Sequence, residues 1–215
     1  MTPAAVLFDC DGIIVDSEDI AFDLLMDEFA THGLTLPRAV LEAEVLGLTM
    51  AGVADRARHL GAALPGDWVS RFYELLYARL AQGTPLIPGI LSVLDRLDAV
   101  GIPYAVGSNG SDRKMEITLG QHPALWARLQ GRMFSGQTLG TPKPAPDLWL
   151  HAARALDADP ARCTVVEDSP TGARAARAAG MRCLAYAPRG DGAAMIREGA
   201  LPFRAMADLP GLLGL

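Results

Sequence analysis

The chain has 215 residues and a mass of 22.8 kDa, a length that predicts one domain, or one domain carrying an insertion. Hydrophobic residues make up 50% of the chain and charged residues 20%, which excludes a disordered tail protein and is enough for a sizeable core. The net charge of −6 and the isoelectric point near 5.2 argue against binding to nucleic acid or an anionic membrane, because both need a cationic surface.

Hydropathy and cysteine usage predict a cytoplasmic protein with no membrane segment. No uncharged apolar run approaches the roughly 20 residues that a membrane span needs. The apolar stretch Ala4–Phe8 follows no basic segment and is too short for a signal peptide. The three cysteines, Cys10, Cys163 and Cys183, have no CxxC spacing, which favours a reducing compartment.

Lysine is rare in this chain. Lys114 and Lys143 are the only lysines among the 19 basic residues, and all the others are arginines. The chain therefore uses arginine wherever any cation serves, and a lysine is a stronger indication of a specific role than usual.

The first predicted strand, Ala4–Phe8, leads directly into Asp9-Cys10-Asp11-Gly12. Asp9 and Asp11 lie two residues apart, so their carboxylates fall on the same side of an extended chain. Gly12 allows the backbone to turn at once. Such a pair is costly unless a shared proton or a hard cation such as Mg²⁺ relieves the repulsion. The alternative is a solvated Asp-Gly turn.

Residues 17–84 carry helical patterns with no predicted strand between them. We interpret this segment as an inserted helical subdomain, with residues 1–16 and 85–215 forming the main domain. The seams are expected near Asp16–Ser17 and Thr84–Pro88. The alternative is that these helices simply cover one face of the sheet. The four predicted helices are Glu18–Thr31, Arg38–Leu46, Ala51–Leu60 and Asp67–Ala81.

Strands and helices alternate through the rest of the chain. The predicted strands are short apolar runs without strict polar alternation, as in a parallel sheet covered on both faces. This alternation predicts an α/β fold with a doubly wound parallel sheet and ligands at the carboxyl ends of its strands. The strands are Tyr104–Gly107, Thr164–Val166 and Cys183–Tyr186, and the helices are Gly89–Val100, Pro146–Leu156 and Thr171–Ala179.

A polar loop, Val106–Ser111, covers the end of the second predicted strand. The hydroxyl of Ser108 and the turn amides from Asn109 onward form a cradle suited to a small anion. The alternative is a Ser/Asn/Gly loop without a ligand.

Lys143 lies between two prolines, Pro142 and Pro144, which stiffen the backbone on both sides. A rigidly held point cation suits a phosphate or a carboxylate nucleophile. The alternative is a surface turn that precedes a helix.

Two more acids, Glu167 and Asp168, follow the third predicted strand, Thr164–Val166, before a helix begins. Asp168 could complete a magnesium site together with the acids after the first strand. The alternative is that Asp168 or Ser169 only caps the following helix.

Taken together, these four elements resemble the motifs of the haloacid dehalogenase-like (HAD) hydrolase superfamily. The similarity covers nearly the whole chain and is greatest to the β-phosphoglucomutase-like branch, and within it to sugar-phosphate phosphatases, including 6-phosphogluconate phosphatases. The resemblance implies a Rossmann-like core, a three-layer αβα sandwich, with an all-helical cap inserted after the first strand. The matching stretches are Phe8–Glu18, Val106–Ser111, Lys143–Asp147 and Val165–Gly172.

The resemblance also implies a mechanism of phosphoryl transfer. Asp9 would attack phosphorus and form an aspartyl-phosphate. Asp11 would protonate the leaving alkoxide and then deprotonate the attacking water. Ser108 and the amide of Asn109 would hold the phosphoryl oxygens, and Lys143 would neutralise the nucleophile and the phosphoryl group.

By the same resemblance, the cofactor is Mg²⁺. Its ligands would be Asp9, the backbone carbonyl of Asp11, and Asp168, with Glu167 binding through water or supporting the site. The expected partner is a small phosphorylated substrate, with no nucleic acid and no membrane, and we expect a monomer.

The acid at Asp11 favours phosphoryl transfer over dehalogenation, since a leaving halide needs no proton. The mutases of this branch carry a cap histidine and a cap arginine where this chain has Ala21 and Met50. The cap turn is kept, and we expect its Gly47 and Thr49 to contact the substrate. These differences favour a phosphatase over a sugar-phosphate mutase. A non-catalytic binding or interaction module is a further alternative, although such a module would usually lack the nucleophile, the acid or the lysine.

Overall fold

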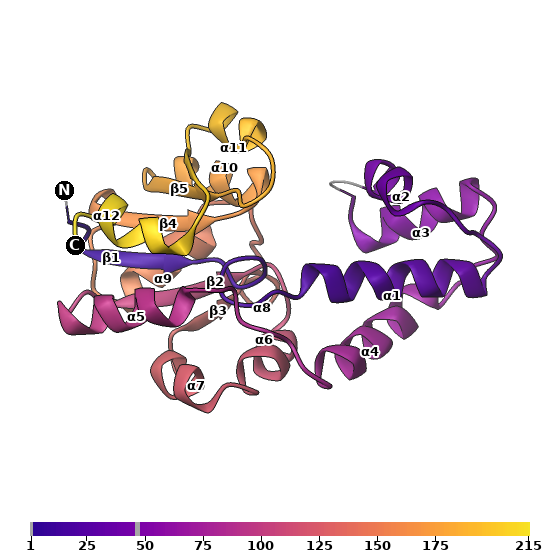
Figure 1. Ribbon diagram of the computed structural model, residues 1–215, viewed down its shortest axis with the longest axis horizontal. Helices are drawn as coiled ribbons and strands as arrows, with labels where there is room; N and C mark the ends of the chain where they lie inside the picture. The colour runs from indigo at the N-terminus through magenta and orange to yellow at the C-terminus, as the bar shows by residue number, and fades with distance from the viewer. Residues whose placement is uncertain (1, 46–47) are drawn as a thin grey trace. The chain divides into compact units, whose positions relative to one another are not determined.

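The computed structural model describes residues 2–45 and 48–215 and divides into two compact units (Figure 1). One unit comprises Met1–Asp16 and Thr84–Leu215, and the other comprises Ser17–Gly83. No helix in the described part of the chain has the length and hydropathy needed to span a bilayer.

A six-stranded sheet forms the centre of the larger unit, in the order β3-β2-β1-β4-β5-β6, and every neighbouring pair is parallel. In this register Phe8, the last residue of β1, lies opposite Val106 of β2 and Val166 of β4, so three strands end at the same edge. The strands are β1 (Ala5–Phe8), β2 (Tyr104–Ser108), β3 (Met133–Ser135), β4 (Cys163–Glu167), β5 (Arg182–Tyr186) and β6 (Leu201–Phe203).

Helices cover both faces of this sheet, which confirms the predicted three-layer α/β fold. Successive residues of β1 point to opposite faces: Val6 and Phe8 join one buried cluster, and Ala5 and Leu7 join the other. The first cluster takes residues from α5 (Ile90–Ala99), α6 (Asp112–Leu119), α7 (Pro123–Leu129) and α12 (Leu209–Leu213). The second takes residues from α9 (Asp147–Ala155), α10 (Pro170–Ala178) and α11 (Ala193–Arg197).

Several elements of this unit were not among the predicted ones. The edge strands β3 and β6 have three residues each, too few to show a periodic pattern. The unpredicted helices are α6, α7, α11, α12 and the single turn α8 (Gly136–Leu139). Two 3₁₀ turns, η1 (Pro160–Arg162) and η2 (Met206–Asp208), complete the unit.

The smaller unit contains four helices and no strand among its described residues. They are α1 (Glu18–Thr31), α2 (Arg38–Val45), α3 (Met50–His59) and α4 (Trp68–Leu80). Its core includes an aromatic stack, in which the ring centroids of Phe29 and Trp68 lie 5.5 Å apart and those of Trp68 and Phe72 lie 5.0 Å apart. This stack joins α1 to α4 and helps to hold the two helices together without a sheet.

The two chain segments that connect the units pair with each other inside the larger one. The amide of Asp16 donates to the carbonyl of Pro85 over 2.8 Å, and the amide of Ile87 donates to the carbonyl of Ile14 over 3.0 Å. These bonds fix where the chain leaves the sheet-containing unit and where it returns.

Candidate active site

The candidate site lies at the shared carboxyl edge of β1, β2 and β4. The amide of Asp9 still donates to the carbonyl of Val166 over 2.9 Å, so Asp9 continues the pairing of β1 with β4. Ser108 and Glu167 are the last residues of β2 and β4. The parallel register therefore brings the predicted residues of three separate motifs to one place, as expected for a doubly wound sheet.

Lys143 is the central cation of this site. Its ammonium donates to Asp9 Oδ1, to Glu167 Oε1 over 2.7 Å and to the carbonyl of Gly107 over 3.2 Å. Its side chain is only 5% exposed, and its Nζ lies 4.7 Å from the ring centroid of Trp149. Burial alone would lower the pKa of Lys143, but Asp9 and Glu167 raise it above its usual value. Lys143 therefore stays charged.

Asn109 fixes the loop that carries Lys143. The amide of Lys143 donates to Asn109 Oδ1 over 2.7 Å, and Asn109 Nδ2 donates to the carbonyl of Lys143 over 2.9 Å. The peptide bond between Lys143 and Pro144 is cis. The side chain of Asn109 is thus used as a strut, and only its backbone remains for the predicted anion contact.

Glu167 anchors the opposite side of Lys143 and is fully buried. Its Oε2 accepts hydrogen bonds from the amides of Asp168 and Ser169, over 3.1 and 3.0 Å, and from the hydroxyl of Ser169 over 2.9 Å. A Cβ at Gly172 would lie 1.7 Å from Glu167 Oε1, so any larger residue would force the carboxylate to shift. Since both carboxylate oxygens already accept hydrogen bonds, Glu167 is best suited to a supporting role.

Asp9, Glu167 and Asp168 could hold a metal ion, because one carboxylate oxygen from each lies within 4.8 Å of the others. Lys143 pairs with two of these carboxylates, Asp9 and Glu167, so the three acids outnumber the lysine that contacts the cluster. Burial raises the pKa of Asp9 to about 7, and Glu167 and Asp11 add to that rise while Lys143 opposes it. The excess of negative charge and the all-oxygen donor set fit a hard divalent cation.

Gly12 shows how closely the first and fourth motifs approach each other. Its φ is +73°, and a Cβ at this position would lie 1.8 Å from Asp168 Oδ2. The turn predicted after Asp11 therefore needs glycine both for its backbone conformation and for the space that Asp168 occupies.

Asp11 belongs to a second, more exposed part of the site. Lys114 Nζ donates to Asp11 Oδ1 over 2.7 Å, and the Ser108 hydroxyl lies 3.5 Å from Asp11 Oδ2. Ser108 Oγ also accepts from the amide of Gly110 over 2.8 Å. Lys114 is not among the predicted site residues, although the scarcity of lysine is a signal that could have identified it.

The structure describes one of the two residues predicted in the cap turn. Gly47 lies outside the described residues. Thr49 belongs to the helical unit and caps α3, where its hydroxyl oxygen accepts from the amide of Gly52 over 3.2 Å. Substrate contact by either residue stays a prediction.

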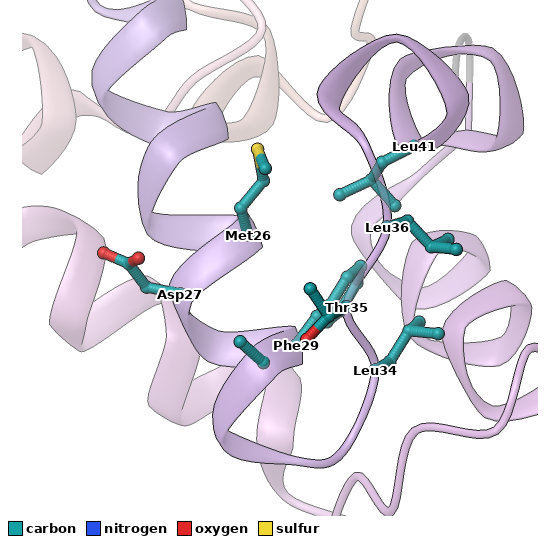
Figure 2. Close-up of a pocket in the computed structure, with 8 residues that line it drawn as sticks. Met26, Asp27, Phe29, Leu34, Thr35, Leu36 and Leu41 are labelled. Atoms are coloured by element: carbon teal, nitrogen blue, oxygen red, sulfur yellow. The ribbon is translucent and has the colours of Figure 1, made fainter.

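The helical unit contains a separate pocket of about 150 Å³. Its lining is largely apolar, and Figure 2 shows the Asp27 carboxylate pointing away from Leu34 and Leu36. None of its lining residues is a lysine, an arginine or a histidine, so it offers no cation for a phosphorylated ligand. The lining residues are Met26, Asp27, Phe29, Ala30, Leu34, Thr35, Leu36 and Leu41.

Comparison with known proteins identifies the family. The model of the haloacid dehalogenase-like hydrolases matches residues 3–180. The chain belongs to this family. The predicted family is thereby confirmed.

Two curated relatives of this hydrolase differ in length. The 6-phosphogluconate phosphatase of Escherichia coli is 29% identical over 210 residues, which cover 97% of this chain and 93% of that protein. The chloroplastic protein SUPPRESSOR OF QUENCHING 1 of Arabidopsis thaliana is 31% identical over 192 residues, which cover 85% of this chain and only 18% of that protein. The hydrolase thus corresponds to nearly all of the first relative and to one part of the second.

A solved structure shares the fold and the length of this hydrolase. The HAD family hydrolase of Deinococcus radiodurans, solved with bound phosphate and sodium, is 31% identical with a TM-score of 0.83. The alignment covers 99% of this chain and 96% of that one.

Proposed function

We propose that this hydrolase is a Mg²⁺-dependent phosphatase of small phosphorylated metabolites, with sugar phosphates as its substrates and an aspartyl-phosphate on Asp9 as its intermediate. The enzyme class, a phosphoric monoester hydrolase, is confirmed by the family match and the phosphatase relative. The observation that carries the mechanism is Lys143, which joins Asp9 to Glu167 beside Asp168.

Asp9 is the proposed nucleophile. A carboxylate can attack a phosphate dianion only where positive charge offsets the repulsion between them. Lys143 supplies a fixed cation at Asp9, and Glu167 and Asn109 hold that lysine in place. The attack forms a bond between an Asp9 carboxylate oxygen and phosphorus and breaks the bond from phosphorus to the ester oxygen.

Asp9, Asp168 and the backbone carbonyl of Asp11 are the proposed ligands of Mg²⁺, with Glu167 in support. When bound, the ion would supply charge neutralisation and orientation of the phosphoryl oxygens. Ser108 Oγ and the backbone amide of Asn109 would hold the remaining phosphoryl oxygens.

Asp11 is the proposed general acid and base. It would give a proton to the leaving ester oxygen and later take one from the water that hydrolyses the aspartyl-phosphate. Its carboxylate lies beside Ser108, where the phosphoryl group is proposed to bind.

Two of the relatives support the substrate class. One is named for the hydrolysis of a phosphorylated sugar acid, and the other was solved with phosphate bound. The helical unit, with Gly47 and Thr49 as substrate contacts, would serve as the cap over the site and choose among sugars. A monomer in the cytoplasm is the setting in which we propose that the enzyme works.

The test is phosphate release from a panel of phosphorylated sugars, sugar acids and nucleotides, measured with Mg²⁺ and with a chelator. We expect Mg²⁺-dependent release from sugar phosphates by the wild type and none by a folded Asp9→Asn variant. Conversion of hexose 1-phosphate to hexose 6-phosphate without free phosphate would instead identify a mutase. Binding of sugar phosphates without turnover would identify a non-catalytic module.

A further inference from the structure

Lys114 is the second of the two lysines, and it occupies a fixed place at the edge of the site. It lies in the first turn of α6, directly after the loop that follows β2. The cap residue Ser111 accepts a hydrogen bond from the amide of Lys114 over 3.2 Å through its hydroxyl oxygen. This N-cap sets the start of the helix, and thereby the point from which the side chain of Lys114 extends.

The ammonium of Lys114 donates a hydrogen bond to one carboxylate oxygen of Asp11, and the other oxygen lies on the side of Ser108. The distance from Lys114 Nζ to Asp11 Oδ1 is 2.7 Å, and the distance from Asp11 Oδ2 to Ser108 Oγ is 3.5 Å. The two ends of the Asp11 carboxylate therefore have different surroundings. Oδ2 is the end beside the proposed phosphoryl position.

We propose that Lys114 is a positioning residue that acts through Asp11, by holding Oδ1 so that Oδ2 faces the oxygen that leaves phosphorus. This inference rests on the proposed function. Proton transfer requires the acid to lie within hydrogen-bond reach of the leaving oxygen, and a carboxylate that rotates freely spends less time there.

The leaving group provides the first test. An alkyl phosphate such as a sugar phosphate releases a poor leaving group that needs the proton, whereas 4-nitrophenyl phosphate releases a good one that does not. Lys114→Met should lower kcat/KM for the best sugar phosphate by roughly 100-fold, the low end of what a general acid contributes. The same variant should change kcat/KM for 4-nitrophenyl phosphate by less than about 3-fold. This is because kcat/KM reports only the steps up to departure of the leaving group, and this leaving group needs no proton. Lys114→Arg, which keeps a donor, should recover part of the loss.

A double-mutant cycle with Asp11→Asn provides the second test. If Lys114 acts through Asp11, then Lys114→Met should add no further loss in the Asp11→Asn background. The matched control is Arg128→Met, which removes a 2.7 Å ion pair to Asp95 outside the site and should leave both esters unaffected.

The outcomes separate this inference from the proposed function. An equal loss on both esters would indicate a merely structural ion pair, and a loss that persists in the Asp11→Asn background would indicate direct contact with substrate. Either result, or no loss at all, overturns the role of Lys114 while the phosphatase stands. A folded wild type that hydrolyses neither ester would overturn both proposals.

Discussion

Two lysines hold the two aspartates of the site, and their surroundings differ. The side chain of Lys143 is 5% exposed and bridges Asp9 and the fully buried Glu167. Lys114 and Asp11 have 20% and 23% of their side chains exposed. A buried ion pair leaves an uncompensated charge when one partner is removed, whereas water screens the loss of a more exposed pair. The same residue type should therefore support both folding and chemistry at one position, and mainly orientation at the other.

The variant that tests this difference between the two lysines most strongly is Lys143→Met, which keeps the apolar stem and removes the charge. Two buried carboxylates would lose their shared partner, so the free energy of unfolding should fall by about 3–5 kcal/mol. Phosphatase activity should fall by about 10²–10³-fold, because the proposed nucleophile, Asp9, loses its cation. Denaturant unfolding and phosphate release measure the two effects.

A second substitution serves as the control for that prediction. Lys143→Met combined with Glu167→Gln removes one of the stranded charges, so part of the lost stability should return without recovery of activity. If Lys143→Met alone were as stable as the wild type, the claim that burial makes this ion pair essential for stability would be wrong.

Mg²⁺ should stabilise the Asp9 side of the site. Binding to the folded state alone raises the free energy of unfolding by about 2.7 kcal/mol when the ion is at 100 times its dissociation constant. We expect Mg²⁺ to raise Tm by several degrees and a chelator to abolish the rise. Asp168→Asn should remove most of this shift, whereas Asp95→Asn, outside the site, should retain it. An equal shift in both variants would place the ion elsewhere.

Gly172→Ala probes the packing behind Lys143 without changing any charge. A Cβ there would lie 1.7 Å from Glu167 Oε1, so the carboxylate that binds Lys143 must shift. We expect a loss of about 1–3 kcal/mol in the free energy of unfolding, together with reduced activity. Gly211→Ala is the matched control, since its Cβ would meet nothing within 4 Å, and it should be neutral or slightly stabilising. Equal stability of the two variants would show that Glu167 is not tightly held.

Lys114→Met should have the smallest effect on stability. Its ion pair with Asp11 is partly exposed, so we expect a change below about 1 kcal/mol in denaturant unfolding. A loss as large as that of Lys143→Met would erase the distinction between the two lysines.

Much of the fold could be predicted from the sequence, because its inner strands are continuous apolar runs and its longer helices have a clear apolar periodicity. The apolar runs at β1, β2, β4 and β5 are buried on both faces, and that burial is what makes such runs recognisable. The edge strands β3 and β6 could not be found in this way, since three residues carry no period and Leu201 is 52% exposed.

The candidate site could be predicted where short sequence motifs carry its reactive residues. Asp9, Lys143 and Glu167 stand at strand ends or in a constrained loop, and the parallel register brings them together. The contact between Lys114 and Asp11 joins residues 103 positions apart. It depends on where α6 begins, and that helix is not among the elements predicted from the sequence.

The most direct test of the central claim is to trap the covalent intermediate. The wild type would be mixed with its best sugar phosphate and Mg²⁺, quenched in acid within milliseconds, and analysed by intact-protein and peptide mass spectrometry. The account predicts a transient gain of one phosphoryl group on Asp9 that is absent from the Asp9→Asn variant. Rapid turnover with no phosphorylated protein at any quench time, or the same phosphorylation in Asp9→Asn, would contradict it.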